Sequence, residues 1–159
     1  MSEIQAAELL EILGRWWFNY DEGNFDVLTS LLTQDAHFTC RTDTGTSHYE
    51  EFARADYQGR DAIMAWQTDH RLHSPYPLRH NGTNAHIVAR HGESATFSSY
   101  IFVSQITESG VSPLSSAIVT GKVRRTDSGV QISALHVALD TMISLPLLDV
   151  QAAAAARSL

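Results

Sequence analysis

The most constraining feature of this sequence is a change of hydrophobic period about halfway along it. Up to residue 72, apolar residues recur three or four positions apart, the spacing of amphipathic helices. After residue 83, segments rich in Val, Ile, Thr and aromatic residues alternate, with glycine-containing turns between them. Helices followed by hairpin-linked strands predict an α+β domain, with the helices packed on one face of a curved, mostly antiparallel sheet.

The period and the turn signals also predict the individual elements. A first helix should end near Tyr20, with Ser2 as its N-cap and Gln5 completing a capping box. Residues 41–59 form a long polar connection, and the tail, residues 143–159, contains an alanine run typical of a short helix. We expect one domain over residues 1–159 with a core of about 5–142. Its other elements would be helices at 25–32 and 60–71 and strands at 36–40, 83–90, 95–106, 115–125 and 130–141.

Charge and cysteine content exclude several classes of partner. The chain of 159 residues has 11 basic and 18 acidic residues, a net charge of −7, which disfavours nucleic acids and anionic membranes. No segment approaches the roughly 18 apolar residues of a membrane span. The start of the chain does not resemble a secretory signal, and the single cysteine, Cys40, fits a reducing compartment. We therefore expect a cytoplasmic protein without nucleic-acid or membrane partners.

Asp21 and His80 are the main candidates for chemistry. Asp21 continues the apolar face of the first helix after Leu13 and Trp17, so its carboxylate would be buried and would need a partner. Alternatively, it turns into solvent at the helix end. His80 follows a proline-bounded loop, and an imidazole held by a carboxylate is a common general base. As one of eight histidines, it could equally be structural.

Further polar residues could contribute to a site. Tyr20 and Tyr100 could donate hydrogen bonds to a substrate oxygen or pack in the core. Asn84 shares strand parity with His80, unless a bulge at Gly82 breaks the alternation. His136 and Asp140 could form a second polar pair in a cavity or could lie on a solvated face. Cys40 could be a nucleophile or a small buried side chain.

No metal or cofactor motif stands out. His70 and His73 are three residues apart but have no nearby acidic ligand, and zinc-type cysteine or HExxH spacing is absent from the sequence. The sequence also has no glycine-rich phosphate loop and no GxSxG elbow. We expect neither a bound metal nor a cofactor.

The order of elements and three local motifs resemble the NTF2-like (SnoaL-like, cystatin-like) superfamily over about residues 5–142. Tyr20-Asp21 at the end of the first helix is similar to a Tyr-Asp pair of the scytalone dehydratases, and His80 stands where those enzymes have a catalytic histidine. The stretch 80–84, His-Asn-Gly-Thr-Asn, also resembles one in the hexachlorocyclohexane dehydrochlorinases. The third motif, Trp66-x-x-x-His70, closes the third helix.

The resemblance implies a conical barrel that encloses a hydrophobic pocket for a small apolar molecule. His80 would take a proton from carbon, Asp21 would orient its imidazole, and water or halide would leave from the neighbouring carbon. Cys40 stands where ketosteroid isomerases carry their base, so their mechanism is not expected. The implied substrate contacts are Trp17, Tyr20, Cys40, Trp66, Asn84, Tyr100 and Asp140.

Three functions are therefore weighed. The first is a cofactor-independent lyase of dehydratase or dehydrohalogenase type, acting on a small cyclic substrate. The second is an isomerase or polyketide-cyclase-like enzyme, and the third is a non-catalytic ligand-binding or structural subunit. Apolar residues on both faces of 130–139 favour a homodimer or homotrimer. The segment 142–148 would cover either the pocket mouth or the interface.

Overall fold

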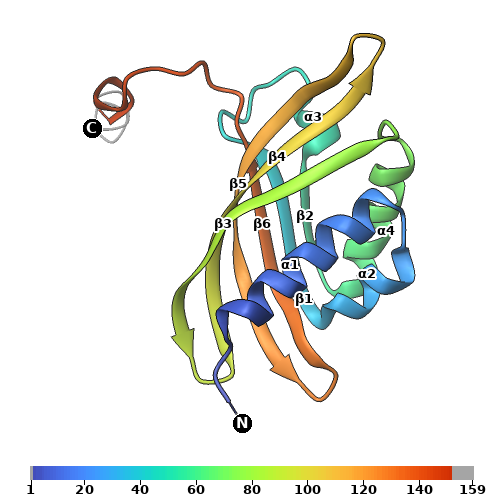
Figure 1. Ribbon diagram of the computed structural model, residues 1–159, viewed down its shortest axis with the longest axis vertical. Helices are drawn as coiled ribbons and strands as arrows, with labels where there is room; N and C mark the ends of the chain where they lie inside the picture. The colour runs from blue at the N-terminus through green and yellow to red at the C-terminus, as the bar shows by residue number, and fades with distance from the viewer. Residues whose placement is uncertain (1, 152–159) are drawn as a thin grey trace.

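A computed structural model describes residues 2–151 of the chain. Helices α1, α2 and α4 pack against one side of a long, curved six-stranded sheet (Figure 1). The predicted α+β class is thereby confirmed. The elements are, in chain order, α1 (Ala6–Asp21), α2 (Phe25–Leu31), β1 (Leu32–Thr42), α3 (Glu50–Ala53), β2 (Ala55–Gln58), α4 (Arg60–Leu72), β3 (Leu78–His91), β4 (Ser94–Thr107), β5 (Gly110–Thr126) and β6 (Gly129–Leu139).

The sheet has the order β2-β1-β6-β5-β4-β3. β1 and β6 run parallel, and all other neighbouring strands are antiparallel. Among the described residues, the edge strands β2 and β3 do not pair with each other, so the sheet curves without closing into the expected barrel. A curved open sheet still leaves a concave face, which the helices cover.

The core lies between α1 and this concave face. Trp16, Phe97 and Leu135 are among its largest fully buried side chains. Gly121 on β5 is required there, because a Cβ at this position would lie 2.2 Å from the carbonyl oxygen of Ala134 and 2.8 Å from the Phe97 ring. Glycine thus lets the β5–β6 hairpin pack directly beneath Phe97.

Three local expectations are corrected. Helix α1 begins at Ala6 with Gln5 as its N-cap, and the Glu8 carboxylate accepts a hydrogen bond from the Gln5 N–H at 2.9 Å. The better capping box is therefore Gln5–Glu8. The polar connection contains the short helix α3 and the edge strand β2. The three long hairpin strands β3, β4 and β5 extend further than predicted.

The C-terminal segment leads away from the body of the molecule (Figure 1). Its apolar residues between 142 and 148 are exposed, so the segment does not cover the pocket of its own chain. Residues 147–151 are helical, and the rest of the predicted tail helix lies outside the described residues. No helix in the described part of the chain is long and apolar enough to cross a bilayer.

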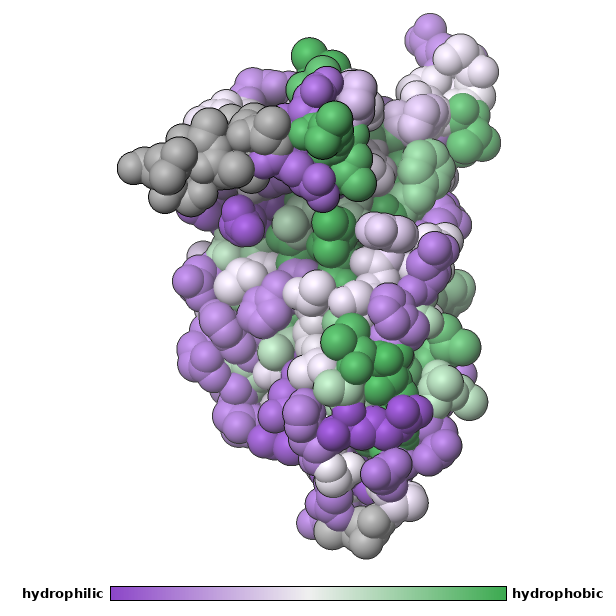
Figure 2. Space-filling view, turned by 90° about the vertical axis from the view of Figure 1, so that its left-hand side faces the viewer, coloured by the Kyte–Doolittle hydropathy of each residue, from purple (hydrophilic) through white to green (hydrophobic). Residues whose placement is uncertain are grey.

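The side of the molecule away from α2 and α4 is not uniformly polar. Figure 2 shows hydrophobic side chains reaching the surface in patches between hydrophilic ones. Large apolar side chains exposed on β4 and β5 include Tyr100, Phe102 and Ile118. Tyr100 and Ile118 face each other across the β4–β5 ladder.

Candidate functional site

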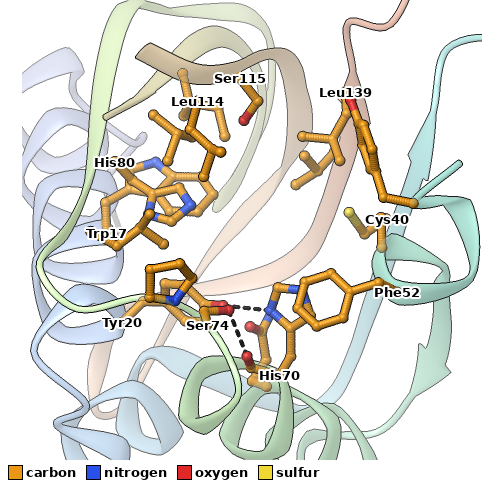
Figure 3. Close-up of a pocket in the computed structure, with 18 of the residues that line it drawn as sticks. Trp17, Tyr20, Cys40, Phe52, His70, Ser74, His80, Leu114, Ser115 and Leu139 are labelled. Carbon is orange, nitrogen blue, oxygen red and sulfur yellow. Dashed lines mark hydrogen bonds between the residues drawn. The ribbon is translucent and has the colours of Figure 1, made fainter. Parts of the chain in front are cut away.

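A cavity of about 350 Å³ lies between α1, α3, α4 and the concave face of the sheet. Aromatic and aliphatic side chains make up most of its wall, and two histidines, His70 and His80, reach it from different elements (Figure 3). A largely apolar cavity with few converging polar groups is the usual form of a small-molecule site. The apolar wall residues include Trp17, Phe38, Phe52, Trp66, Leu78, Ile101, Val103, Val137 and Leu139.

Asp21 and His80 form the first polar pair of the cavity. One carboxylate oxygen accepts a hydrogen bond from the His80 Nδ1–H at 2.6 Å, and the other accepts the His80 backbone N–H at 2.7 Å. The side chains are only 5% and 12% exposed, respectively. Because Asp21 is an acceptor, it holds the hydrogen of the neutral imidazole on Nδ1 and leaves Nε2 as an acceptor.

Arg71 fixes the end of α1 that carries this pair. Its buried guanidinium donates to the carbonyl oxygens of Tyr20 (3.1 Å) and Asp21 (2.8 Å). It also donates to the carbonyl of Pro75 in the loop before β3, at 3.0 Å. A cation at a helix C-terminus complements the helix dipole and satisfies carbonyls that have no helical partner. Arg71 therefore ties α1, α4 and the start of β3 together.

Trp17 supports His80 from the side. The indole and imidazole rings stack with centroids 5.1 Å apart and an angle of 9° between their planes. Behind the indole, β3 approaches so closely that a Cβ on Gly82 would lie 3.2 Å from the Trp17 ring. The small residue at 82 and the large one at 17 together define the position of the imidazole.

Tyr20 and His70 form the second polar pair. The Tyr20 hydroxyl lies 2.6 Å from His70 Nδ1, and the ring of Tyr20 also meets His80 edge-on, with centroids 5.2 Å apart. The rings of Trp66 and Phe52 contact His70 at centroid distances of 4.5 and 4.4 Å. His70 is thus fixed by one hydrogen bond and two aromatic contacts.

Burial sets the protonation of this second pair. It lowers the pKa of His70 to about 4, and a charge on His80 acts in the same direction. Burial likewise raises the pKa of the Tyr20 phenol well above its usual value. Both groups are therefore neutral at physiological pH.

Helix α3 brings the rim of the cavity into place. The buried Glu50 carboxylate accepts hydrogen bonds from the backbone N–H of Thr42, at 3.1 Å, and from its hydroxyl. This contact anchors α3 to the end of β1. Phe52 is half exposed and lines the cavity, so α3 contributes one aromatic ring to the cavity rim.

The predicted site residues fall into two groups. Trp17, Tyr20, Cys40, Trp66 and His80 line the cavity, with Asp21 directly behind His80. Burial raises the pKa of the Cys40 thiol to about 12, with a further contribution from Glu50, so a thiolate nucleophile is disfavoured.

Three predicted substrate contacts do not line the cavity: Asn84, Tyr100 and Asp140. Tyr100 is 53% exposed on the opposite face of β4, because its neighbour Ile101 faces the cavity and side chains alternate along a strand. Asn84 is exposed where the β3–β4 register shifts, with φ of 56°. The bulge thus lies beyond Gly82, not at it.

Of the two alternatives for His136 and Asp140, the structure agrees with the one outside the cavity, since neither residue lines it. His136 lies 2.9 Å from the Thr39 hydroxyl, and the Asp140 carboxylate accepts a hydrogen bond from Ser116 at 2.5 Å. The cavity-facing residues of β6 are Val137 and Leu139, which have the opposite parity to His136 and Asp140. Both polar residues therefore lie on the other face of the sheet.

Sequence reasoning missed two residues of the site. His70 had a signal, because it follows Trp66 by four residues and so shares its helix face. Arg71 had none, since a buried arginine that binds only carbonyl oxygens cannot be distinguished by sequence from a solvated one. Among the described residues, no group of three or more potential ligands could hold a metal ion.

Comparison with solved structures places the fold among cystatin-like proteins. A Nostoc punctiforme protein of unknown function with a cystatin-like fold is 19% identical with a TM-score of 0.68, over 92% of this chain and 99% of that one. A candidate dehydratase of the NTF2-like family from Streptomyces avermitilis is 13% identical, with a TM-score of 0.66 over 87% and 96% of the two chains.

A third similar structure is the beta subunit of a candidate aromatic-ring-hydroxylating dioxygenase from Novosphingobium aromaticivorans. It is 12% identical, with a TM-score of 0.68 over 89% of this chain and 93% of that one. No curated protein sequence matches the chain significantly. These low identities show a shared fold only.

The sequence itself is more specific than these structural likenesses. The family model of the SnoaL-like domain matches residues 5–136, which include α1, most of the cavity wall and both histidines. This match spans most of the chain and agrees with the helix-and-sheet architecture described above. The chain therefore belongs to the SnoaL-like domain family, within the NTF2-like group of folds.

Proposed function

We propose that this protein is a cofactor-independent lyase that eliminates water or halide from a small, mostly apolar cyclic substrate. The observation that carries the proposal is the Asp21–His80 pair at the wall of an apolar cavity. Nδ1 of His80 is occupied by Asp21, and Nε2 makes no hydrogen bond within the described part of the chain. A free, correctly oriented imidazole nitrogen in such a cavity is suited to act as a general base.

The proposed chemistry starts at carbon. His80 Nε2 removes a proton, and the Asp21 carboxylate stabilises the imidazolium that forms. The electron pair left on carbon then expels hydroxide or halide from the neighbouring carbon. For loss of hydroxide, the imidazolium returns its proton and water is released; for loss of halide, the imidazolium gives its proton to solvent. Imidazole is basic enough to remove a proton from carbon only where a neighbouring group delocalises the electron pair that is left behind. A carbonyl next to that carbon does so.

Two model compounds test the proposal. 1-Indanone has acidic hydrogens next to its carbonyl but no leaving group, so exchange of these hydrogens for deuterium measures proton abstraction alone. 3-Hydroxy-1-indanone can lose water to give inden-1-one, which mass spectrometry detects as the loss of one water molecule. An isomerase or cyclase would retain all atoms of its substrate.

Variants of the pair provide the decisive comparison. His80→Gln and Asp21→Asn should each slow deuterium exchange by about 10²–10⁴-fold, the usual contribution of a general base. His86→Gln is the matched control, because His86 is exposed on the same strand. Wild-type exchange in His80→Gln would contradict the base assignment. Binding of 1-indanone without any exchange by the wild type would favour the non-catalytic alternative.

We also propose that the outer face of the sheet joins two or three copies of the chain. The support is the exposed cluster of Tyr100, Phe102 and Ile118, since exposed apolar patches often mark protein interfaces. Light scattering should give a multiple of the 17.6 kDa chain mass. Ile118→Asp should reduce that mass, and Val88→Asp, an exposed change on β3 outside the cluster, should have a smaller effect.

A further inference from the structure

The second imidazole of the cavity has a partner that determines which of its nitrogens carries hydrogen. The Tyr20 hydroxyl is buried and lies 2.6 Å from Nδ1 of His70, and the hydroxyl of Ser74 lies close to it as well. A buried phenol needs an acceptor for its hydrogen. The nearby Ser74 hydroxyl donates to the His70 carbonyl at 2.7 Å (Figure 3). Since the Ser74 hydrogen is directed to that carbonyl, we assign the Tyr20 hydrogen to Nδ1 of His70, which places the hydrogen of the neutral imidazole on Nε2.

This assignment makes the two histidines complementary. His80 is held with hydrogen on Nδ1 and offers Nε2 as an acceptor, whereas His70 offers an Nε2–H donor. Both rings line the same cavity. Within the described residues, Nε2 of His70 has no hydrogen-bond partner, so the donor is available to a ligand.

We propose that His70, held by Tyr20 as the Nε2–H form, binds the carbonyl oxygen of the substrate while His80 removes a proton from the adjacent carbon. This inference rests on the proposed role of His80 and adds the group that receives the developing charge. When the C–H bond breaks, its electron pair moves toward the carbonyl and places negative charge on the oxygen. The His70 N–H strengthens its hydrogen bond to that oxygen without transferring its proton.

A neutral donor suits a cavity in which the base becomes positively charged. Burial, together with a smaller contribution from the charge on His80, lowers the pKa of His70 to about 4. The pair therefore passes through the reaction with one imidazolium, not two. A fixed dipole in a water-poor site can stabilise an oxyanion strongly because it needs no reorganisation.

Tyr20 acts in this scheme as a positioning residue. Its hydroxyl is engaged with His70, so it reaches the substrate only through that imidazole. This differs from the direct contact expected from the sequence. The rings of Trp66 and Phe52 complete the support, because they prevent His70 from rotating away from the cavity.

Infrared difference spectroscopy of bound 1-indanone tests the donor directly. A hydrogen bond moves the carbonyl stretch to lower wavenumber than in an apolar solvent. We expect this shift in the wild type and in His80→Gln, and its loss in His70→Phe. His70→Gln, which retains an N–H donor, should restore part of it, and Tyr20→Phe should reduce it. His73→Phe is the matched control, since His73 is exposed just beyond α4.

The two roles fail separately in this design. Loss of deuterium exchange in His80→Gln with the carbonyl shift retained supports both assignments. An unshifted carbonyl in the wild type, an absence of binding, or a shift unchanged in His70→Phe overturns the role of His70. Wild-type exchange in His80→Gln overturns the proposed base and leaves the His70 result interpretable.

A measurement on the wild type avoids any variant that fails to fold. Nitrogen-15 NMR of the histidine side chains distinguishes protonated from unprotonated ring nitrogens. We expect Nε2–H for His70 and Nδ1–H for neutral His80. A His70 with its hydrogen on Nδ1 would overturn the inference, because Nε2 would then be an acceptor.

Discussion

Two neighbouring residues of α1 hold the two histidines of the cavity in contrasting ways. Asp21 and Tyr20 each lie 2.6 Å from the Nδ1 atom of one imidazole. The carboxylate can only accept, whereas the phenol donates in the arrangement proposed above, so the free nitrogens of the two rings have opposite character there. The comparison teaches that the partner behind an imidazole, and not the imidazole alone, determines what it offers to a ligand.

The two pairs also differ in their response to charge. Asp21 places a carboxylate at hydrogen-bond distance from the ring of His80. His70 has apolar rings around it and no carboxylate at hydrogen-bond distance among the described residues, and its pKa is lowered accordingly. One ring is therefore arranged to accept a proton, and the other is arranged to remain neutral.

Removing Arg71 should disturb both pairs and give the largest loss of stability. Arg71→Met leaves the carbonyls of Tyr20, Asp21 and Pro75 without their shared donor, and we expect a loss of about 3 kcal/mol. Denaturant titration measures it. Arg79→Met is the control, because its ion pair with Glu22 is partly exposed to solvent and should contribute less than about 1 kcal/mol. Equal losses in the two variants would contradict the anchoring role of Arg71.

The pH dependence of stability should distinguish the two pairs, because His70 stays neutral in the folded protein. Between pH 6.5 and about 4, the unfolded chain protonates this histidine and the folded protein does not, so stability falls as pH falls. Two variants are compared, Tyr20→Phe alone and Tyr20→Phe combined with His70→Phe. The second should lose about 2–3 kcal/mol less stability over this pH range than the first. The measurement is the free energy of unfolding across that range for both variants. Parallel curves would show that His70 does not remain neutral.

A methyl group at position 82 should affect one pair and spare the other. Gly82→Ala would press on Trp17, which stacks on His80, and we expect a loss of about 1 kcal/mol. The ring signals of His80 should shift in NMR spectra, while those of His70 remain in place. Thr83→Ala, an exposed change on the same strand, is the control. Equal shifts of both histidines would show that the two pairs are mechanically coupled.

Sequence patterns predicted the long elements well because burial imposes a period on them. They also identified Asp21, whose helical spacing from Trp17 placed it on the buried face of α1. The edge strand β2 has four residues and one buried side chain, too little pattern to detect. The predicted start of α1 was wrong because Ser2 and Gln5 both fit a capping motif, and only the structure shows which residue is the N-cap.

Long-range pairing explains the remaining differences. Tyr100 was expected in the cavity because an aromatic residue fits either face of a strand, and parity is fixed only once Ile101 is known to be buried. The role of Tyr20 depends on His70, fifty positions away in the sequence. Neither contact leaves a local pattern.

The aromatic stacks give this protein built-in optical reporters. Of its three tryptophans, Trp17 stacks on His80, Trp66 stacks on His70, and Trp16 is buried in the core. An imidazolium quenches the fluorescence of an indole in contact with it, whereas a neutral imidazole does so far less. Emission from Trp17 should therefore follow the charge of the proposed base, whereas emission from Trp66 should stay constant because the proposed donor remains neutral. Single-tryptophan variants would allow the protonation of His80 to be followed during turnover without an added label.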